Sequence, residues 1–220
     1  MQAKTLISSS IKSIHPVEDG NTALEMMDQY RVHHLAVVKN NFYLAAISDK
    51  EIMNWDSEDD AIEDHLNNLA SPHVKYNQHL FDIIEVLEKN NLSVVPVLDE
   101  KNRYLGVITS RKLMYSIAKS ATIQSPGGVI VLQMNNNDYS LTEIASIVES
   151  NNTKILSSYI ISIPDSTNIE VTIKLNKQDV NAIIKDFERR NYTVSASYKD
   201  EEADRDFSER YESLMRFLNP

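Results

Sequence analysis

One apolar pattern occurs twice in this chain, and it constrains the fold more than any other feature of the sequence. The later copy, Leu92–Met114, has an apolar run around Pro96, a polar turn, and a second apolar run that ends at Thr109. The earlier copy, Val32–Met53, repeats this pattern and is one residue shorter within the turn. Val32 therefore corresponds to Leu92 before the turn, and Met53 to Met114 after it. A unit repeated at this period needs a partner to cover its apolar face, so we expect the copies to pack together.

Length and composition narrow the class of protein. The chain has 220 residues, 42% of them apolar, which is enough for one or two domains with hydrophobic cores. It has no cysteine, which excludes disulfides, thiolate nucleophiles and cysteine-ligated zinc. Its net charge of −10 argues against nucleic acid as a partner, because phosphate binding relies on clustered Lys and Arg. No apolar run approaches the roughly 20 residues that span a bilayer, and the first residues do not form a signal peptide. We therefore expect a cytoplasmic protein with no membrane partner.

Helical and extended patterns alternate in the same order in both copies. The first copy predicts a helix at about 21–31, strands at about 34–38 and 43–47, and a short helix at 50–55. The second predicts a helix at about 80–87, strands at 93–98 and 104–109, and a closing helix from Leu113. Short apolar strands between helices favour a sheet covered by helices. The acidic run 56–60 between the copies lacks the glycine of a calcium loop, so we expect a solvated helix start with Ser57 as N-cap.

These residues resemble a tandem pair of CBS domains, known as a Bateman module. The resemblance covers about residues 1–120 and is carried by Val95-Pro96-Val97, by Leu105–Thr109, and by the equivalent segments of the first copy. It assigns residues 1–60 to the first repeat and 61–120 to the second.

The resemblance implies two clefts between the repeats, commonly occupied by adenine nucleotides, so AMP, ADP, ATP or S-adenosylmethionine are the regulatory ligands to expect. It also implies a Thr or Ser followed three residues later by an Asp that binds the ribose hydroxyls. These positions hold Ser48 with Glu51, and Thr109 with Lys112. Glu51 keeps the negative charge, whereas Lys112 reverses it and could instead meet a phosphate. The other candidate ligand contacts are Ile47, Ile108, His34 and Pro96.

The same positions have a second interpretation, in which Glu51 and Lys112 are surface charges at helix starts beside empty clefts. Nothing in the sequence indicates catalysis: no nucleophile elbow or glycine-rich phosphate loop is present. His33 and His34 are adjacent on a strand and point to opposite faces, so we expect no metal site there. The prediction is a protein that is not an enzyme.

The C-terminal half begins with a break in composition. Residues 121–128, which contain Pro126 and two glycines, are predicted to be a linker. Apolar periodicity then predicts strands at 129–134, 155–163, 169–175 and 192–198, with helices at 141–148 and 180–187. This βαββαβ order is a ferredoxin-like plan, assigned to residues 129–199.

After a CBS pair, that order resembles an ACT domain, a fold often used to sense amino acids, over about 127–199. The ACT turn has a glycine two residues before a Leu of the first helix, where this chain has Tyr139 before Leu141. A bulky residue there argues against amino-acid binding and favours a degenerate ACT domain used for pairing or packing over a working sensor. Asp138 is predicted to cap the helix. The combined order resembles CBS–ACT proteins of the acetoin-utilisation regulator type.

The tail, residues 200–220, has a charged connector and then an apolar helical face made of Phe207, Tyr211, Leu214 and Leu218. It is predicted to be a helix that docks on its own chain or on a second subunit. The fold class is thus α/β (α+β): a CBS pair, an ACT-type domain and a C-terminal helix. We expect a homodimeric regulatory protein that binds an adenine nucleotide and acts on an unidentified protein partner. The alternative is an assembly module without a ligand.

Overall fold

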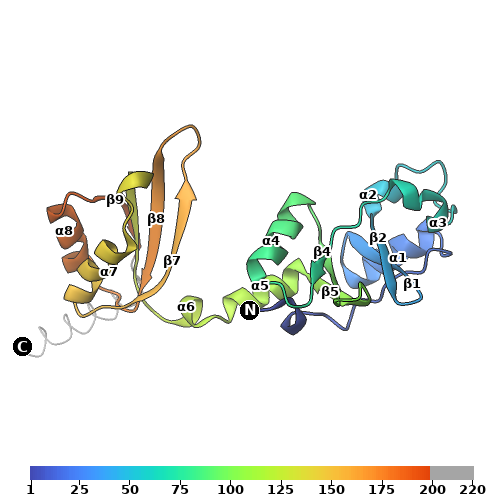
Figure 1. Cartoon of the computed structure of the whole chain (residues 1–220), viewed down its shortest axis with the longest axis horizontal. Coiled ribbons are helices and arrows are strands. Elements are labelled where there is room, and N and C mark those ends of the chain that lie inside the picture. Colours follow the sequence, from blue (N-terminus) through green and yellow to red (C-terminus); the bar gives the residue numbers. More distant parts are fainter. Residues whose placement is uncertain (199–220) are drawn as a thin grey trace, which may run out of the picture. The chain divides into compact units, whose positions relative to one another are not determined.

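The computed structural model describes residues 1–198, in two compact units divided between Ala118 and Lys119 (Figure 1). The tail helix predicted within residues 200–220 lies outside the described residues. Among the residues described, no helix is long and apolar enough to cross a membrane.

The first unit contains both copies of the repeat, and the predicted helices and strands are confirmed. After the short 3-10 helix η1 (Ala3–Thr5), the first copy contains α1 (Gly20–Tyr30), β1 (His34–Lys39), β2 (Phe42–Ser48) and α2 (Asp49–Ile52). The connection contains α3 (Ile62–His65) and η2 (Leu66–Asn68). The second copy contains β3 (Val74–Lys75), α4 (Leu80–Lys89), β4 (Val94–Leu98), β5 (Tyr104–Thr109) and α5 (Ser110–Ala118).

The two copies share backbone details as well as element order. The antiparallel pair β1–β2 has a register shift at Val37, and the pair β4–β5 has one at Val97, the equivalent position of the second copy. Val97 pairs in parallel with Val74, and Val37 makes a parallel bridge with Ile14, the equivalent of Val74 in the first copy. The strands of the duplicated unit therefore pair in the same way in both copies, whereas the closing helix is shorter in the first copy.

Each repeat is covered by the segment that leads into the other one. Ser8 N donates a 2.7 Å hydrogen bond to Val107 O on β5, and Ala46 N on β2 donates a 2.9 Å hydrogen bond to Ala70 O. Ala46 and Val107 are equivalent positions of the two copies. Segment 3–6 contributes Ala3 and Leu6 to the core of the second repeat, while Leu66 and Leu69 pack against the core of the first. The repeats thus fold as a mutually covered pair about a pseudo-twofold axis.

The second unit has the predicted ferredoxin-like order. Its elements are β6 (Val129–Asn135), α7 (Leu141–Ser150), β7 (Ile155–Ser162), β8 (Asn168–Leu175), α8 (Asn181–Arg189) and β9 (Thr193–Tyr198). The strands form one antiparallel sheet in the order β7-β8-β6-β9, and α7 and α8 lie on the same face of it (Figure 1). Between sheet and helices lies a core that includes Leu132, Val171, Ile144 and Phe187, all fully buried.

Part of the stretch expected to be a linker is helical, as α6 (Ala121–Gln124). Two predictions of helix caps were wrong. Ser57 is not an N-cap: α3 begins after Ala61, and Ser57 Oγ instead accepts a hydrogen bond from Asp59 N in a turn. Asp138 does not cap α7, because it lies in the 3-10 turn η3 (Asn136–Asp138) and Ser140 Oγ accepts from Glu143 N in its place.

Candidate ligand cleft between the repeats

The strand starts of both repeats meet around a cleft in the first unit. Its volume is about 430 Å³, within the range of small-molecule sites. The wall is formed by His33, His34, Ser48, Asp49, Lys50, Asn90, Asn91, Leu92, Ser93 and Ser110. His33 and Ser93 are equivalent positions of the repeat, as are Asp49 and Ser110, so the cleft lies at the pseudo-twofold axis.

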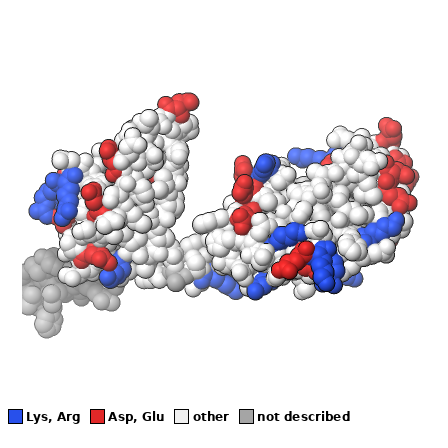
Figure 2. Space-filling view, in the orientation of Figure 1, with Lys and Arg blue, Asp and Glu red and all other residues white. Residues whose placement is uncertain are grey.

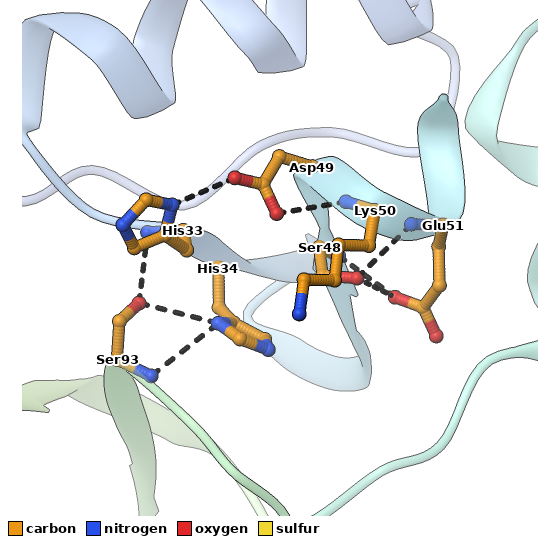
Figure 3. A network of polar contacts seen from close by, with 7 residues as sticks. All are labelled: His33, His34, Ser48, Asp49, Lys50, Glu51 and Ser93. Atoms are coloured by element: carbon orange, nitrogen blue, oxygen red, sulfur yellow. Dashed lines mark hydrogen bonds and ion pairs between the residues drawn. The ribbon is translucent and has the colours of Figure 1, made fainter. Parts of the chain in front are cut away.

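A polar network joins the repeats across this axis (Figure 3). Ser93 Oγ accepts a 2.9 Å hydrogen bond from His33 N and lies 3.2 Å from His34 Nδ1. Ser93 N donates to the same ring nitrogen at 3.3 Å. Because a backbone N–H can only donate, His34 Nδ1 must accept, which leaves the proton of the neutral ring on Nε2. Burial lowers the pKa of His34 from its ordinary value of 6.5 and favours this neutral form.

The ring of His33 is held by a hydrogen bond to Asp49. Its Nδ1 lies 2.7 Å from Asp49 Oδ2. Burial raises the pKa of Asp49, but hydrogen bonds from His33 and from Lys50 N outweigh it, so the net pKa is lowered. Asp49 is therefore a carboxylate and His33 Nδ1 donates to it. Nδ1 therefore carries a proton in His33 and none in the neighbouring His34.

The first predicted ribose position is occupied by a helix cap. Ser48 is 7% exposed, and its backbone N and Oγ donate to Glu51 Oε2 at 2.8 and 2.7 Å. Glu51 N donates back to Ser48 Oγ at 3.2 Å, which completes a capping box at the start of α2. Glu51 lines a separate hollow of about 320 Å³ with Trp55 and His65, whose rings stack 3.9 Å apart. Ser48 faces the cleft, whereas Glu51 faces away from it.

The second predicted position has the same cap but a different side-chain partner. Thr109 Oγ1 accepts a 3.0 Å hydrogen bond from Lys112 N. Lys112 Nζ donates to Ile7 O, on the segment that covers the second repeat. This ammonium is held by a backbone carbonyl and is not part of the cleft wall.

Of the eight predicted contacts, Ser48 and His34 line the cleft. Ile47, Ile108 and Pro96 are buried in the strands behind it, so their contact with a ligand stays a prediction. Sequence reasoning missed the loop Asn90–Ser93, together with Asp49, Lys50 and Ser110. The repeat offset itself could have found Ser93, because it places Ser93 opposite His33. Within residues 1–198, no group of three or more His, Asp or Glu side chains could hold a metal ion.

In the second unit, Tyr139 stands at the position of the ACT glycine. Its φ is −68°, which any residue adopts, and its ring packs against the core of the unit. The backbone here therefore does not require a glycine.

Comparison with known proteins identifies the repeats. Residues 3–58 and 69–119 match the family model of the CBS domain. Among curated proteins, a homoserine O-acetyltransferase of Methanocorpusculum labreanum is 28% identical over 122 residues, which is 53% of this chain and 24% of that enzyme. The chain therefore spans about a quarter of that relative's length.

Solved structures match over about half of the chain. A CBS domain pair/ACT domain protein from Thermotoga maritima is 14% identical, with a TM-score of 0.48, 55% of this chain covered and 99% of that one. The CBS domains of a transcriptional regulator from Streptococcus pneumoniae are 13% identical, with a TM-score of 0.45, covering 52% and 98%. The CBS domain of a bacterial CNNM/CorC family Mg²⁺ transporter, in complex with ATP, is 12% identical, with a TM-score of 0.44, covering 54% and 87%.

Proposed function

Since this chain belongs to the CBS-domain family, with two repeats in tandem before an ACT-like domain, we propose that it is a cytoplasmic, non-enzymatic regulatory protein. In this proposal the repeats bind an adenine nucleotide, or a related ligand such as S-adenosylmethionine, in the cleft between them. The supporting observation is the cleft of about 430 Å³ at the pseudo-twofold axis, to which both repeats contribute polar side chains.

The wall of the cleft suits the phosphate end of such a ligand. Lys50 supplies an ammonium, and Ser110 is the first residue of the nine-residue helix α5, whose N-terminus favours an anion. The negative charge of Asp49, which also lines the cleft, would repel an anion, but this carboxylate is already hydrogen-bonded to His33. Glu51 uses Oε2 in its cap and lines the separate hollow with Trp55 and His65, so this proposal assigns it no contact with a ligand in the cleft.

In this proposal, the contacts between the two repeats transmit the binding of a ligand in the cleft to the rest of the protein. Ser93 and His34 join the repeats by hydrogen bonds at the wall of the cleft, so a ligand there contacts groups that set the repeat arrangement. A ligand that binds one arrangement more tightly shifts the population toward it. We propose that the protein partner of the regulatory signal reads this shift.

We also propose a homodimer formed through the helices of the repeats. Phe81 and Ile84 on α4 and Met114 on α5 are exposed apolar side chains. Met53, the equivalent of Met114 in the first repeat, is exposed as well. Apolar side chains at matching positions of both repeats suit a self-complementary interface.

A thermal-shift panel of AMP, ADP, ATP and S-adenosylmethionine tests the ligand proposal. A compound that binds only the folded chain must raise the Tm of unfolding, by an amount that grows with its concentration. The variant Lys50→Gln removes the ammonium in the cleft and should reduce the shift for the phosphorylated compounds. The control Lys12→Gln changes the charge equally at an exposed position outside the cleft and should leave the shift unchanged.

A second candidate function is a ligand-free assembly module, and one observation favours it. Glu51 and Lys112, at the two ribose positions, both have partners within the chain: Ser48 and Ile7. If none of the four compounds changes the Tm, the assembly module remains as the function. An assembly module should have an oligomeric state that no nucleotide changes and that Met114→Glu disrupts, as measured by light scattering.

A further inference from the structure

The edge strand β7 of the second unit has backbone groups that point away from its sheet. β7 is the outermost strand in the order β7-β8-β6-β9, so among the residues described it pairs with β8 alone. Just beyond the end of β7, Ile163 N donates a 3.2 Å hydrogen bond to Asn168 O. Hydrogen-bonded pairs alternate along an antiparallel ladder, and the register carries this alternation back along β7. The residues whose N–H and C=O groups point outward are therefore Ser158, Ile160 and Ser162.

The sequence of β7 lacks the features that usually protect an edge strand. Natural edges carry Lys, Pro or a bulge that prevents pairing with another chain. Residues 155–163 contain no charged residue, proline or glycine, and the bulge of β7 lies at its start, before Ser157. Tyr159 is 55% exposed, Ile160 44% and Ile161 51%. Figure 2 shows few charged atoms along β7. This edge is therefore suited to pairing with a further strand.

The stretch of β7 that can accept another strand has a defined length. At its start, Thr122 Oγ1 on α6 donates a 3.3 Å hydrogen bond to Leu156 O, so this carbonyl already has a partner. At its end, Pro164 has no N–H to donate. Residues 157–163 lie between these limits, and we call their outer side the open edge.

We propose that the open edge pairs antiparallel with the open edge of a second copy of this chain, about a twofold axis at Ile160. In this register Ile160 faces the partner's Ile160, and Ser158 faces the partner's Ser162. Each such pair exchanges two backbone hydrogen bonds, so all the outward-pointing groups are satisfied. A register shifted to either side sets one of these residues opposite Pro164, or opposite Leu156, whose carbonyl is already bonded.

The side chains also match in this register. Tyr159 lies opposite the partner's Ile161 in a non-hydrogen-bonded pair, where side chains are closest, and an aromatic residue opposite a β-branched one stabilises an antiparallel pair. The charged residues that β7 faces in its own sheet, Glu170 and Lys174, lie on β8. Two copies that each carry a net charge of −10 therefore meet here without like charges directly opposite one another. The interface joins second units and is separate from the dimer proposed through the helices of the repeats.

Disulfide trapping tests the register in the full chain, which has no native cysteine. An equal mixture of the single variants Tyr159→Cys and Ile161→Cys should form disulfide-linked dimers under mild oxidation, seen as a dimer band without reductant. Each variant alone should link at least tenfold more slowly, because a cysteine and its own copy lie on the diagonal. Diagonal Cβ atoms are roughly 7 Å apart, against about 3.5–4.5 Å in a disulfide. Faster linking by either variant alone, or no linking in the mixture, would contradict the proposed pairing.

Two further variants separate this interface from the one proposed through the repeats. The disulfide should still form in chains that also carry Met114→Glu, and its complete loss there would assign the contact to the repeats. In the Met114→Glu background, Ile160→Lys places two ammonium groups opposite one another and should weaken self-association at least tenfold by sedimentation equilibrium. The matched control Leu141→Lys changes an exposed apolar residue on α7 and should leave self-association unchanged. Equal effects of the two lysines, or no effect of Ile160→Lys, would contradict pairing at the open edge.

Discussion

Gly106→Ala is the substitution whose effect follows most directly from the structure. Gly106 lies on β5 at a φ of +138°, a backbone conformation that side chains rarely adopt. A Cβ there would lie 2.6 Å from Ile7 Cγ2, on the segment that covers the second repeat. Backbone strain of about 1–3 kcal/mol adds to an overpacking cost of about 1–3 kcal/mol, so we expect a loss of about 2–6 kcal/mol. That is a large part of the stability of a domain.

Denaturant unfolding followed by fluorescence measures this loss. The chain has one tryptophan, Trp55, which lies in the first unit and reports on it separately from the second. The equivalent position in the first repeat holds Ala45, which is buried. The control Ala45→Gly should cost only about 1–2 kcal/mol, from chain entropy and one lost methyl group.

A double variant separates the contact from the backbone strain. Ile7→Ala removes the atom that the new Cβ would meet, so Gly106→Ala should cost less in that background than in the parent chain. A Gly106→Ala variant that unfolds within about 0.5 kcal/mol of the parent would contradict the packing of Ile7 on β5.

Three further outcomes are expected. Ser93→Ala removes the hydroxyl that joins the repeats and should cost about 1–2 kcal/mol by Trp55 fluorescence, while a cost near zero would contradict the network. Because the pKa of His34 is lowered from 6.5 on folding, the unfolded chain binds more protons below that pH. Stability should therefore fall as the pH drops from about 6.5 toward the folded pKa, and unfolding of His34→Gln across pH 5–8 should show a shallower slope than the parent. Phe187→Ala empties a fully buried site and should cost the second unit about 3–5 kcal/mol, measured by near-ultraviolet circular dichroism, and a loss below about 1 kcal/mol would place Phe187 outside the core.

Much of the fold could be predicted because its signals are periodic. The stripe Leu80, Ile83, Ile84 and Leu87 predicts α4, and the strict alternation of residues 169–175 predicts β8. The helix caps could not be placed in the same way. Ser140 caps α7 in place of Asp138 because the chain makes one more turn before the helix, and the sequence does not show where that turn ends.

The candidate site was predicted less well than the fold. Ser48 and His34 follow from the resemblance to the family, but the loop that ends at Ser93 does not. Its contacts with His33 and His34 join residues 59 and 60 positions apart. No local pattern encodes such contacts, because they depend on the packing of one repeat on the other.

Because each repeat is covered by the segment that leads into the other one, neither repeat should fold as a separate fragment. A fragment cut at residue 60 would take Ala3 and Leu6 away from the second repeat and leave Leu66 and Leu69 behind with it. Each half would then expose apolar surface that only the other half can hide. Two such fragments expressed together should reassemble into one particle, whereas either one alone should aggregate.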